Sequence, residues 1–265
     1  MNTLTDTELN GFSRLMFEAA GITLAPTKKA LVEGRISKRL HALGLATFTD
    51  YLRHIRHDAA ERQQAIDLLT TNETYFFREP RHFAYLSETI VPSADASRPF
   101  RVWSAACSSG EEPYSIAMVL AERMGQRPWE IVASDISTRV IDQARRAIYP
   151  MERAEKIPQA YLKAFCLKGT GTQEGMFTLQ PSIRDRLRFQ IINLNTTLPD
   201  LGTFDLIVLR NVMIYFDADT KRAVCRRLLD VLRPGGHLFI GHSESLNGLD
   251  LQVRAVQPAV YRKPL

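Results

Sequence analysis

The stretch FRVWSAACSSGEEPYSIAMVLAERMG, residues 100–125, decides the fold. Residues 100–106 form a short apolar run typical of a buried strand, and residues 111–125 carry a helical pattern. Between them lies a loop of small residues that ends at Gly110. A strand that passes through a short loop into a helix is the first half of a βαβ unit. This stretch therefore predicts a parallel sheet covered by helices.

The same alternation continues toward the C-terminal end. Further strands are predicted at residues 129–135, 186–194, 204–210 and 237–242, and further helices at 137–148 and 217–232. Residues 251–263 predict a terminal β-hairpin. Right-handed crossovers between successive strands then give an open α/β sheet, so the sequence predicts an α/β fold.

One segment interrupts this rhythm. Residues 157–186 do not form one clean helix, and Gly169, Gly171 and Gly175 punctuate the run KGTGTQEGMFTL. Closely spaced glycines permit a tight turn, so a hairpin is expected. We predict a small β-subdomain inserted at about 157–186.

The first seventy residues carry helical patterns alone. One apolar stripe ends at Gly21, a residue suited to a helix C-terminus, and a second helix is expected from Thr27 to about Ala42. Two shorter helices are expected near 48–57 and 59–70. The predicted domains are a helical one at 1–70 and a sheet domain at 71–265. The second helix has a basic flank: Lys28, Arg35, Lys38 and Arg39.

Composition limits the cellular setting. Cys107, Cys166 and Cys225 are scattered and odd in number, which favours a reducing cytoplasm over a disulfide framework or a zinc site. His54 and His57 lack neighbours that would complete a metal shell, so no metal is expected. The N-terminus lacks a secretory pattern, and the apolar run 206–216 is too short to span a bilayer. The net charge of +5 favours an acidic partner without specifying its class.

Open parallel sheets bind ligands beyond the carboxyl ends of their strands. Asp135 ends the second strand and is placed to hold a ribose diol, although it would serve equally well as a helix N-cap. The first loop has one glycine, Gly110, and the acidic pair Glu111 and Glu112 opens its helix, which would repel a pyrophosphate. These residues favour a phosphate-free cationic nucleoside, such as S-adenosylmethionine, over NAD or FAD.

Five separated motifs, read together, resemble one family. They are TNETYFFRE (71–79), WSAACSSGEEPYSIA (103–117), SDIS (134–137), RNVMIYF (210–216) and LRPGGHLFIGHSE (232–244). In this order, and over nearly the whole chain, they resemble the chemotaxis receptor methyltransferases of the CheR type. The resemblance implies a Rossmann-like class I methyltransferase sheet and a protein-glutamate O-methyltransferase acting in chemotaxis adaptation. It also implies S-adenosylmethionine as cofactor and S-adenosylhomocysteine as product.

The resemblance implies roles for ten positions. Asn72, Thr74 and Arg78 match a linker that contacts the cofactor. Glu112 would bind the methionine amino group, and Asp135 would hold the ribose. Asn193 and Leu194 would flank the adenine, and Asn211 and Val212 would lie at the methionine end. Glu111 stays an alternative to Glu112. Arg78 and Tyr215 are the expected catalytic residues, facing the transferring methyl group and the incoming carboxylate. The aromatics at 75–77 are expected to build or support dry walls beside Arg78.

The resemblance also implies partners. The helical domain and its basic flank would face the methylation region of a chemoreceptor's cytoplasmic domain, and the β-subdomain would dock a receptor C-terminal peptide along an open strand edge. We expect a cytoplasmic monomer without direct membrane insertion and without a nucleic-acid partner. Two alternatives stay open at this point: a binding module without turnover, and a related methyltransferase acting on nucleic acid, for which a catalytic Asn/Asp-Pro-Pro-aromatic tetrapeptide is absent from the sequence.

Overall fold

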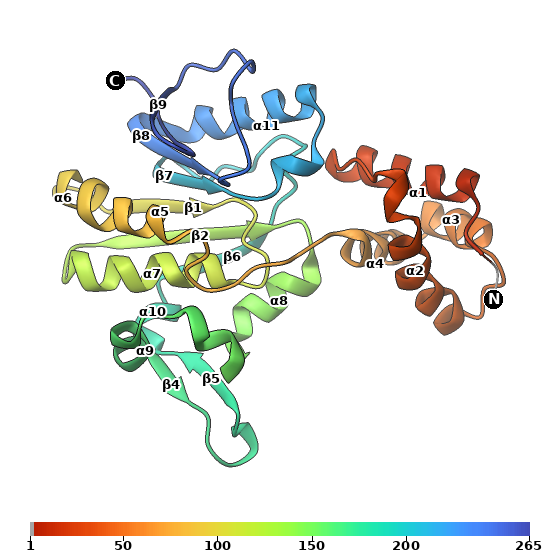
Figure 1. Cartoon of the computed structure of the whole chain (residues 1–265), viewed down its shortest axis with the longest axis horizontal. Helices are drawn as coiled ribbons and strands as arrows, with labels where there is room; N and C mark the ends of the chain where they lie inside the picture. The colour runs from red at the N-terminus through yellow and green to blue at the C-terminus, as the bar shows by residue number, and fades with distance from the viewer. Residues whose placement is uncertain (1–2) are drawn as a thin grey trace.

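The computed structural model describes residues 3–265, and in it a helical bundle leads into a large sheet (Figure 1). The bundle consists of α1 (Asp6–Ala20), a short 3₁₀ turn η1 (Pro26–Lys28), α2 (Lys29–Leu43), α3 (Phe48–His57) and α4 (Ala59–Leu69). The predicted apolar stripes meet in one core, which contains Phe12, Ile36 and Tyr51. Gly21 ends α1 with a left-handed φ of 70°, as its position predicts.

Two residues of the predicted basic flank serve the bundle itself. Arg35 Nη1 donates to the carbonyl oxygens of residues 68 and 70, both at 2.8 Å, so it satisfies the C-terminal end of α4. Arg39 forms a two-bond pair with Glu61, at 2.6 Å and 2.5 Å. Of the four flank residues, Lys28 and Lys38 remain exposed. Arg35 and Arg39 thus make contacts within the bundle, and the expectation that the basic flank faces a receptor stays a prediction.

The large sheet has the parallel arrangement that the sequence predicts. Among the described residues its strands are β1 (Phe100–Ser104), β2 (Trp129–Asp135), β6 (Leu187–Ile191), β7 (Phe204–Leu209), β8 (Leu232–Ile240), β9 (Arg254–Gln257) and β10 (Val260–Arg262). Their spatial order is β6-β2-β1-β7-β8-β10-β9, and β10 runs antiparallel to both of its neighbours, β8 and β9. The order reverses between β1 and β7, so a ligand crevice is expected at that point.

Helices cover both faces of this sheet. Because side chains alternate along a strand, Val102 packs on the side of α7 (Glu111–Met124), while Trp103 packs against α11 (Ala218–Val231). The α8 helix (Thr138–Arg146) lies on the α7 side and contacts β2 and β6. The predicted α/β fold with a helical N-terminal part is thereby confirmed.

Some elements differ from prediction. The sequence patterns predict no element at residues 80–99, yet this stretch forms α5 (Pro80–Tyr85), a π-helical turn η2 (Leu86–Ile90) and α6 (Val91–Ser93). The helix predicted at 137–148 ends at Arg146, because Ala147 takes a left-handed φ of 52°. Strand β8 starts at Leu232, five residues before the predicted strand.

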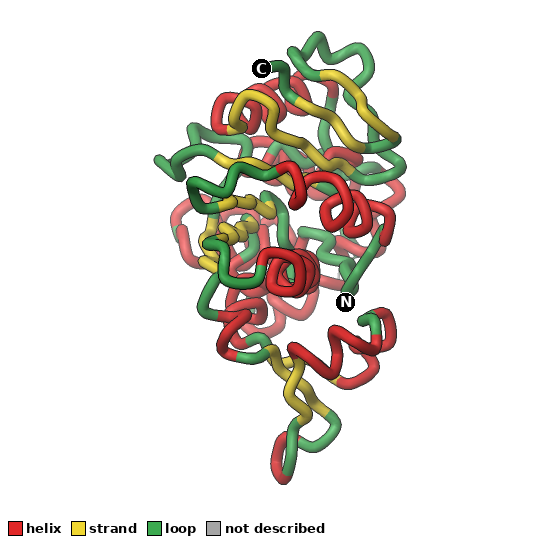
Figure 2. The backbone as a smooth tube through the Cα atoms, turned by 90° about the vertical axis from the view of Figure 1, so that its left-hand side faces the viewer, coloured by secondary structure: helices red, strands yellow, loops and turns green. Residues whose placement is uncertain are grey.

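A second sheet forms the inserted subdomain. Its strands, in the order β3-β5-β4, are β3 (Ile148–Pro150), β5 (Met176–Leu179) and β4 (Cys166–Lys168), with η3 (Met151–Lys156), α9 (Gln159–Phe165), η4 (Gly171–Gln173) and α10 (Pro181–Arg184) around them. The subdomain thus begins before the range of 157–186 suggested by the sequence. Figure 2 shows the β4–β5 hairpin projecting from the body. A Cβ on Gly169 would lie 2.0 Å from the carbonyl oxygen of Gln173, so this turn requires glycine.

The helical bundle docks on the loops at the strand ends through polar contacts. Buried Asp67 of α4 accepts hydrogen bonds from the backbone N–H groups of Thr138 and Arg139, at 3.0 Å and 3.3 Å, and so caps α8. Thr23 donates its N–H to the carbonyl of Tyr215 at 2.9 Å. None of the helices in residues 3–265 has the length and apolar character needed to cross a membrane.

The Arg39–Glu61 pair gives a stability prediction. The Arg39 guanidinium holds the pKa of Glu61 below its ordinary value of 4.5, and Tyr51 also donates to Glu61, at 2.7 Å. The Glu61→Gln variant should lose about 2 kcal/mol of unfolding free energy at pH 7, measured by urea denaturation. A carboxyl with a depressed pKa stabilises the fold above its unfolded-state pKa. The gap to wild type should therefore shrink as the pH falls below 4.5.

The exposed Asp6–Lys29 pair supplies the control. Asp6→Asn removes a 2.6 Å contact at the solvent-exposed surface and should leave the stability nearly unchanged. Equal losses in the two variants would contradict the assigned importance of Glu61.

Candidate active site at the carboxyl ends of the strands

A cavity of about 330 Å³ lies beyond the carboxyl ends of β1, β2, β6 and β7. The helical bundle closes one side of it with residues 22–25 and Lys28. All ten residues predicted for the site line this one cavity: Asn72, Thr74, Arg78, Glu112, Asp135, Asn193, Leu194, Asn211, Val212 and Tyr215. The structure thus brings together side chains that are spread over more than half of the sequence.

The linker at residues 71–79 crosses the cavity between the bundle and the sheet. The Ser108 hydroxyl donates to the carbonyl of Asn72 at 2.8 Å. Asn72 Oδ1 is buried and has no hydrogen-bond partner within residues 3–265. A buried acceptor without a partner is costly, so this atom is suited to a ligand donor. The Thr74 carbonyl accepts from Arg153 at 2.9 Å, which ties the linker to the inserted subdomain.

The aromatic run of the linker divides between the cavity and the core. Tyr75 lines the cavity and is 41% exposed, whereas Phe76 and Phe77 are buried in the main core. Phe76 packs edge-on against Tyr149 at 5.1 Å between ring centroids. Of the three rings expected to build or support dry walls, Tyr75 lies at the cavity, and Phe76 and Phe77 support the linker from the core. The guanidinium of Arg78 lies 5.7 Å from the centre of the Tyr75 ring.

The two adjacent glutamates at the start of α7 have different surroundings. Glu111 is buried away from the cavity, where it accepts from Ser109 at 2.7 Å and from Arg153 at 2.8 Å. Glu112 lines the cavity and accepts from the Ser104 hydroxyl at 2.6 Å. Of the two glutamates, Glu112 is the one that lines the cavity, and its role toward a ligand stays a prediction.

A buried guanidinium organises the acidic side of the cavity. Arg210 follows β7, its side chain is only 3% exposed, and it lies 3.2 Å from both the Glu79 and Glu112 carboxylates. It also donates to the carbonyl of Arg78. Burial raises the pKa of Glu112, and Arg210 opposes that rise only in part. Burial also acts to raise the pKa of Glu79, but Arg210 and the backbone N–H of His242 outweigh it, so that pKa is lowered.

Asp135 lies where β2 ends and faces the cavity. It accepts backbone hydrogen bonds from Ser108 at 2.9 Å and Ser137 at 3.0 Å. Burial raises its pKa, and these N–H donors offset part of the rise. The N-cap alternative is wrong, because Ser137 is the N-cap of α8, and Asp135 bonds the N–H of that cap residue rather than an N–H of the helix while lining the cavity.

The remaining predicted residues connect the cavity to neighbouring elements. Asn193 Nδ2 donates to the carbonyl of Ala19 in the bundle at 2.5 Å, and Leu194 belongs to the core on the α11 side. Asn211 has a left-handed φ of 59°, and its N–H donates to Glu244 at 3.0 Å. Tyr215 lies in a short turn, η5 (Met213–Tyr215), whose carbonyl end is held by Thr23.

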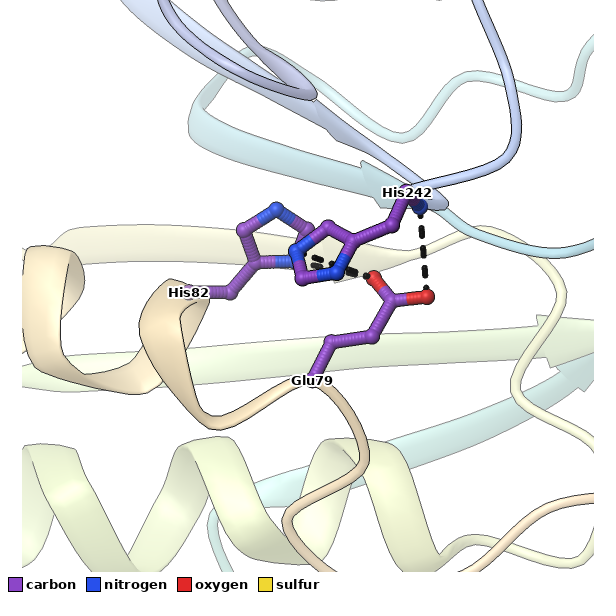
Figure 3. A group of neighbouring side chains, drawn as sticks. All are labelled: Glu79, His82 and His242. Atoms are coloured by element: carbon purple, nitrogen blue, oxygen red, sulfur yellow. Dashed lines mark hydrogen bonds and ion pairs between the residues drawn. The ribbon is translucent and has the colours of Figure 1, made fainter.

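A histidine–carboxylate group lies beside this site and escaped the sequence analysis. Glu79, His82 and His242 present ligand atoms within 4.8 Å of one another (Figure 3). Burial lowers the pKa of His82 to about 4, so this ring is neutral near pH 7. Such a group could coordinate a metal ion, but the Arg210 guanidinium already contacts the shared Glu79 oxygen at 3.2 Å. We therefore interpret the group as an internally compensated charge cluster.

The chemistry of the cavity is defined by its charges. The carboxylate of Asp135 faces it from the end of β2, that of Glu112 from the first turn of α7, and the Arg78 guanidinium from the linker. The first turn of α7 carries two acidic residues, Glu111 and Glu112, which a phosphate group would not favour. The arrangement suits a ligand with a hydroxyl-bearing part, a cationic part and an adjacent anionic reactant.

Comparison with known proteins agrees with this geometry. Residues 7–70 match the family described as CheR methyltransferase, all-alpha domain, and residues 72–261 match CheR methyltransferase, SAM binding domain. The chain is 43% identical to Chemotaxis protein methyltransferase 2 of Pseudomonas aeruginosa over 249 residues, covering 93% of this chain and 89% of that protein. It is 40% identical to the Chemotaxis protein methyltransferase of Escherichia coli over 265 residues, covering 97% of this chain and 91% of that protein. The chain therefore belongs to the CheR family of methyltransferases, with an all-helical domain followed by a Rossmann-like, S-adenosylmethionine-binding class I sheet.

Proposed function

We propose that this protein methylates glutamate side chains of chemotaxis receptors, using S-adenosylmethionine, and thereby serves chemotaxis adaptation. The observation that supports this most directly is the single cavity in which Glu112, Asp135 and Arg78 converge. S-adenosylmethionine would supply a methyl group on a sulfonium, and the reaction would leave a glutamate methyl ester and S-adenosylhomocysteine.

The cavity residues fit that cofactor by their chemistry. Asp135 offers carboxylate oxygens to a ribose diol, Glu112 offers an anion to the α-amino group, and the unpartnered Asn72 Oδ1 offers an acceptor. Asn193 and Leu194 would flank the adenine, and Asn211 and Val212 the methionine end. Thr74 would complete the linker side of the site. We infer no metal in this reaction, since these residues provide both charge balance and orientation.

The receptor glutamate needs no general base, because its pKa of about 4.3 leaves it ionised at neutral pH. The chain's task is then to align the carboxylate and exclude water. Arg78 and the Tyr215 hydroxyl are the groups proposed to hold it, and Tyr75 and Ile214 line the same opening. Arg78 must orient the anion without trapping it, because tight ground-state binding would not lower the barrier.

Partner contacts are proposed at two places. Exposed Lys28 and Lys38 on the bundle suit an acidic receptor surface, and Lys28 also lines the cavity. The β4 edge of the subdomain is bonded on one side only within residues 3–265, to β5, and exposes Leu167. A receptor C-terminal peptide could add a strand there and raise the local concentration of substrate. We propose that the protein acts in the cytoplasm as a monomer, without membrane insertion or nucleic acid.

Arg78→Ala should reduce methyl transfer by about 100-fold or more while costing less than about 1 kcal/mol of stability. Within residues 3–265 the guanidinium makes one hydrogen bond, to the Glu73 carbonyl at 3.0 Å, so little structure depends on it. Transfer of isotope-labelled methyl groups to a receptor fragment, as base-labile ester, gives the activity, and thermal melting gives the stability. Arg81→Ala, an exposed position on α5, is the matched control. An unfolded variant whose remaining folded fraction keeps full activity would make Arg78 structural.

Asp135→Asn should weaken S-adenosylhomocysteine binding by about tenfold or more, because a neutral amide replaces the carboxylate offered to the ribose. Isothermal titration calorimetry measures the affinity directly. Asp142→Asn changes an exposed carboxylate on α8 and should leave the affinity unchanged. If Asp135→Asn binds S-adenosylhomocysteine with wild-type affinity, Asp135 does not hold the ribose.

Leu167→Asp should abolish binding of a labelled receptor C-terminal peptide, measured by fluorescence anisotropy, because it places a charge on the proposed docking edge. Ile148, on the opposite edge strand β3, is a similarly exposed apolar residue, so Ile148→Asp is the control variant. This variant should bind the peptide with wild-type affinity. Methylation of a receptor fragment without that peptide should be the same in both variants. Loss of binding in the Ile148 variant alone would move the docking edge to β3.

A further inference from the structure

Glu79 has no assigned role, although it lies next to Arg78 and is one of the most connected side chains near the cavity. Its Oε2 lies 3.2 Å from Arg210 Nε, and its Oε1 accepts from Asn211 Nδ2 at 3.3 Å and from the His242 N–H at 3.2 Å. Glu79 itself is not among the residues that line the cavity. It is therefore placed to act on a ligand only through its neighbours.

We infer that Glu79 is a positioning residue that neutralises Arg210 and so leaves the negative charge of Glu112 available to a ligand ammonium group. The inference rests on the proposed function, because the ammonium group is that of S-adenosylmethionine. The role assigned to Glu79 is to keep the carboxylate of Glu112 free to bind the amino group. Neither the family membership nor the cavity lining specifies such a role.

The argument begins with the charge that Arg210 brings. Its guanidinium is 3% exposed and stays protonated, so it needs a compensating anion inside the protein. Glu112 is the other carboxylate in contact with it, at 3.2 Å from Nη1. If Glu112 were its one counter-ion, the pair would be neutral and an ammonium group would enter a buried site without a partner, which is unfavourable.

Glu79 changes this balance. Arg210 and Glu79 sum to zero charge, so ionised Glu112 contributes the single negative charge that an ammonium group requires, and an ammonium group beside Glu112 would offset the burial that raises its pKa. The depressed pKa of Glu79 agrees with an ionised carboxylate, and the adjacent His82 ring is neutral near pH 7 and adds no charge. His242 presents its ring nitrogen 3.8 Å from Glu79 and its backbone N–H to the other oxygen.

The backbone shows that this placement is specific. Glu79 takes a left-handed φ of 60°, and Phe77, two residues earlier, takes one of 55°. Side-chain-bearing residues adopt this conformation at a cost that surrounding contacts must offset. The Arg210 bond to the carbonyl of Arg78 and the Ser115 hydroxyl, which accepts from the Phe77 N–H at 2.9 Å, hold the turn. The turn thus delivers Glu79 to Arg210 while Arg78 faces the cavity.

Two ligands separate this role from a general structural one. S-adenosylhomocysteine carries the amino group, whereas 5′-methylthioadenosine keeps the nucleoside and thioether but lacks the amino acid part. In the Glu79→Gln variant, the dissociation constant for S-adenosylhomocysteine should rise by about tenfold or more, while that for 5′-methylthioadenosine should stay within about threefold of wild type. Both are measured by isothermal titration calorimetry. Glu88→Gln, an exposed glutamate on η2, is the control and should change neither.

The outcomes are distinguishable. A wild-type chain that binds neither nucleoside would overturn the proposed function, and this inference with it. Binding by wild type together with equal weakening of both ligands in Glu79→Gln, or with no weakening, would overturn this inference alone.

A double variant covers the case in which the single one does not fold. Glu79→Gln combined with Arg210→Gln removes the cation together with its counter-ion. Glu112 then needs no protection, and the ratio of the two dissociation constants should return to within about threefold of the wild-type ratio. A double variant that folds and binds 5′-methylthioadenosine but discriminates against S-adenosylhomocysteine would refute the charge-compensation role.

Discussion

A single buried guanidinium constrains the architecture around the cavity. Arg210 stands after the central strand β7 with almost no access to water, and a charge in that position is stable only if the surrounding chain supplies partners. Glu79 supplies one from the linker, Glu112 another from the first turn of α7, and Arg78 a carbonyl. Three segments that are far apart in sequence must therefore meet at this strand end. The cavity is the space that remains beside them.

The second constraint comes from the helical bundle, which completes the cavity that the sheet leaves open. Asp67 caps α8 from outside the sheet domain, and it does so immediately after the loop that carries Asp135. Asn193 bonds the carbonyl end of α1 through its side chain, and Thr23 bonds the Tyr215 carbonyl. Each contact joins the bundle to a loop that lines the cavity. The bundle is therefore part of the wall of the cavity.

Much of this could be predicted from sequence, for identifiable reasons. The strands of the large sheet are apolar runs between helices, and their carboxyl ends must share one edge, so residues such as Asp135 and Asn211 were expected to converge. Long-range charge pairing has no local signature. Arg39 resembled any exposed helix cation, and Glu79 resembled a polar residue before a proline. The left-handed backbone at Phe77 and Glu79 could not be predicted either, because tertiary contacts stabilise it against the preference of non-glycine residues for negative φ.

Charge balance connects the fold to the proposed chemistry. The low-dielectric end of β7 holds two glutamates against one arginine, which leaves one negative charge directed at the cavity, while Arg78 adds one positive charge to the lining of the same cavity. In the proposed reaction the methyl group moves from a sulfonium to a carboxylate, and both charges are neutralised. A transition state with less charge than its reactants is favoured where water is excluded, provided that the fixed charges are already compensated. The Glu79–Arg210 contact supplies that compensation without occupying the reactants' space. The buried ion pair therefore matters less as a source of stability than as the condition under which a dry, charged cavity can exist.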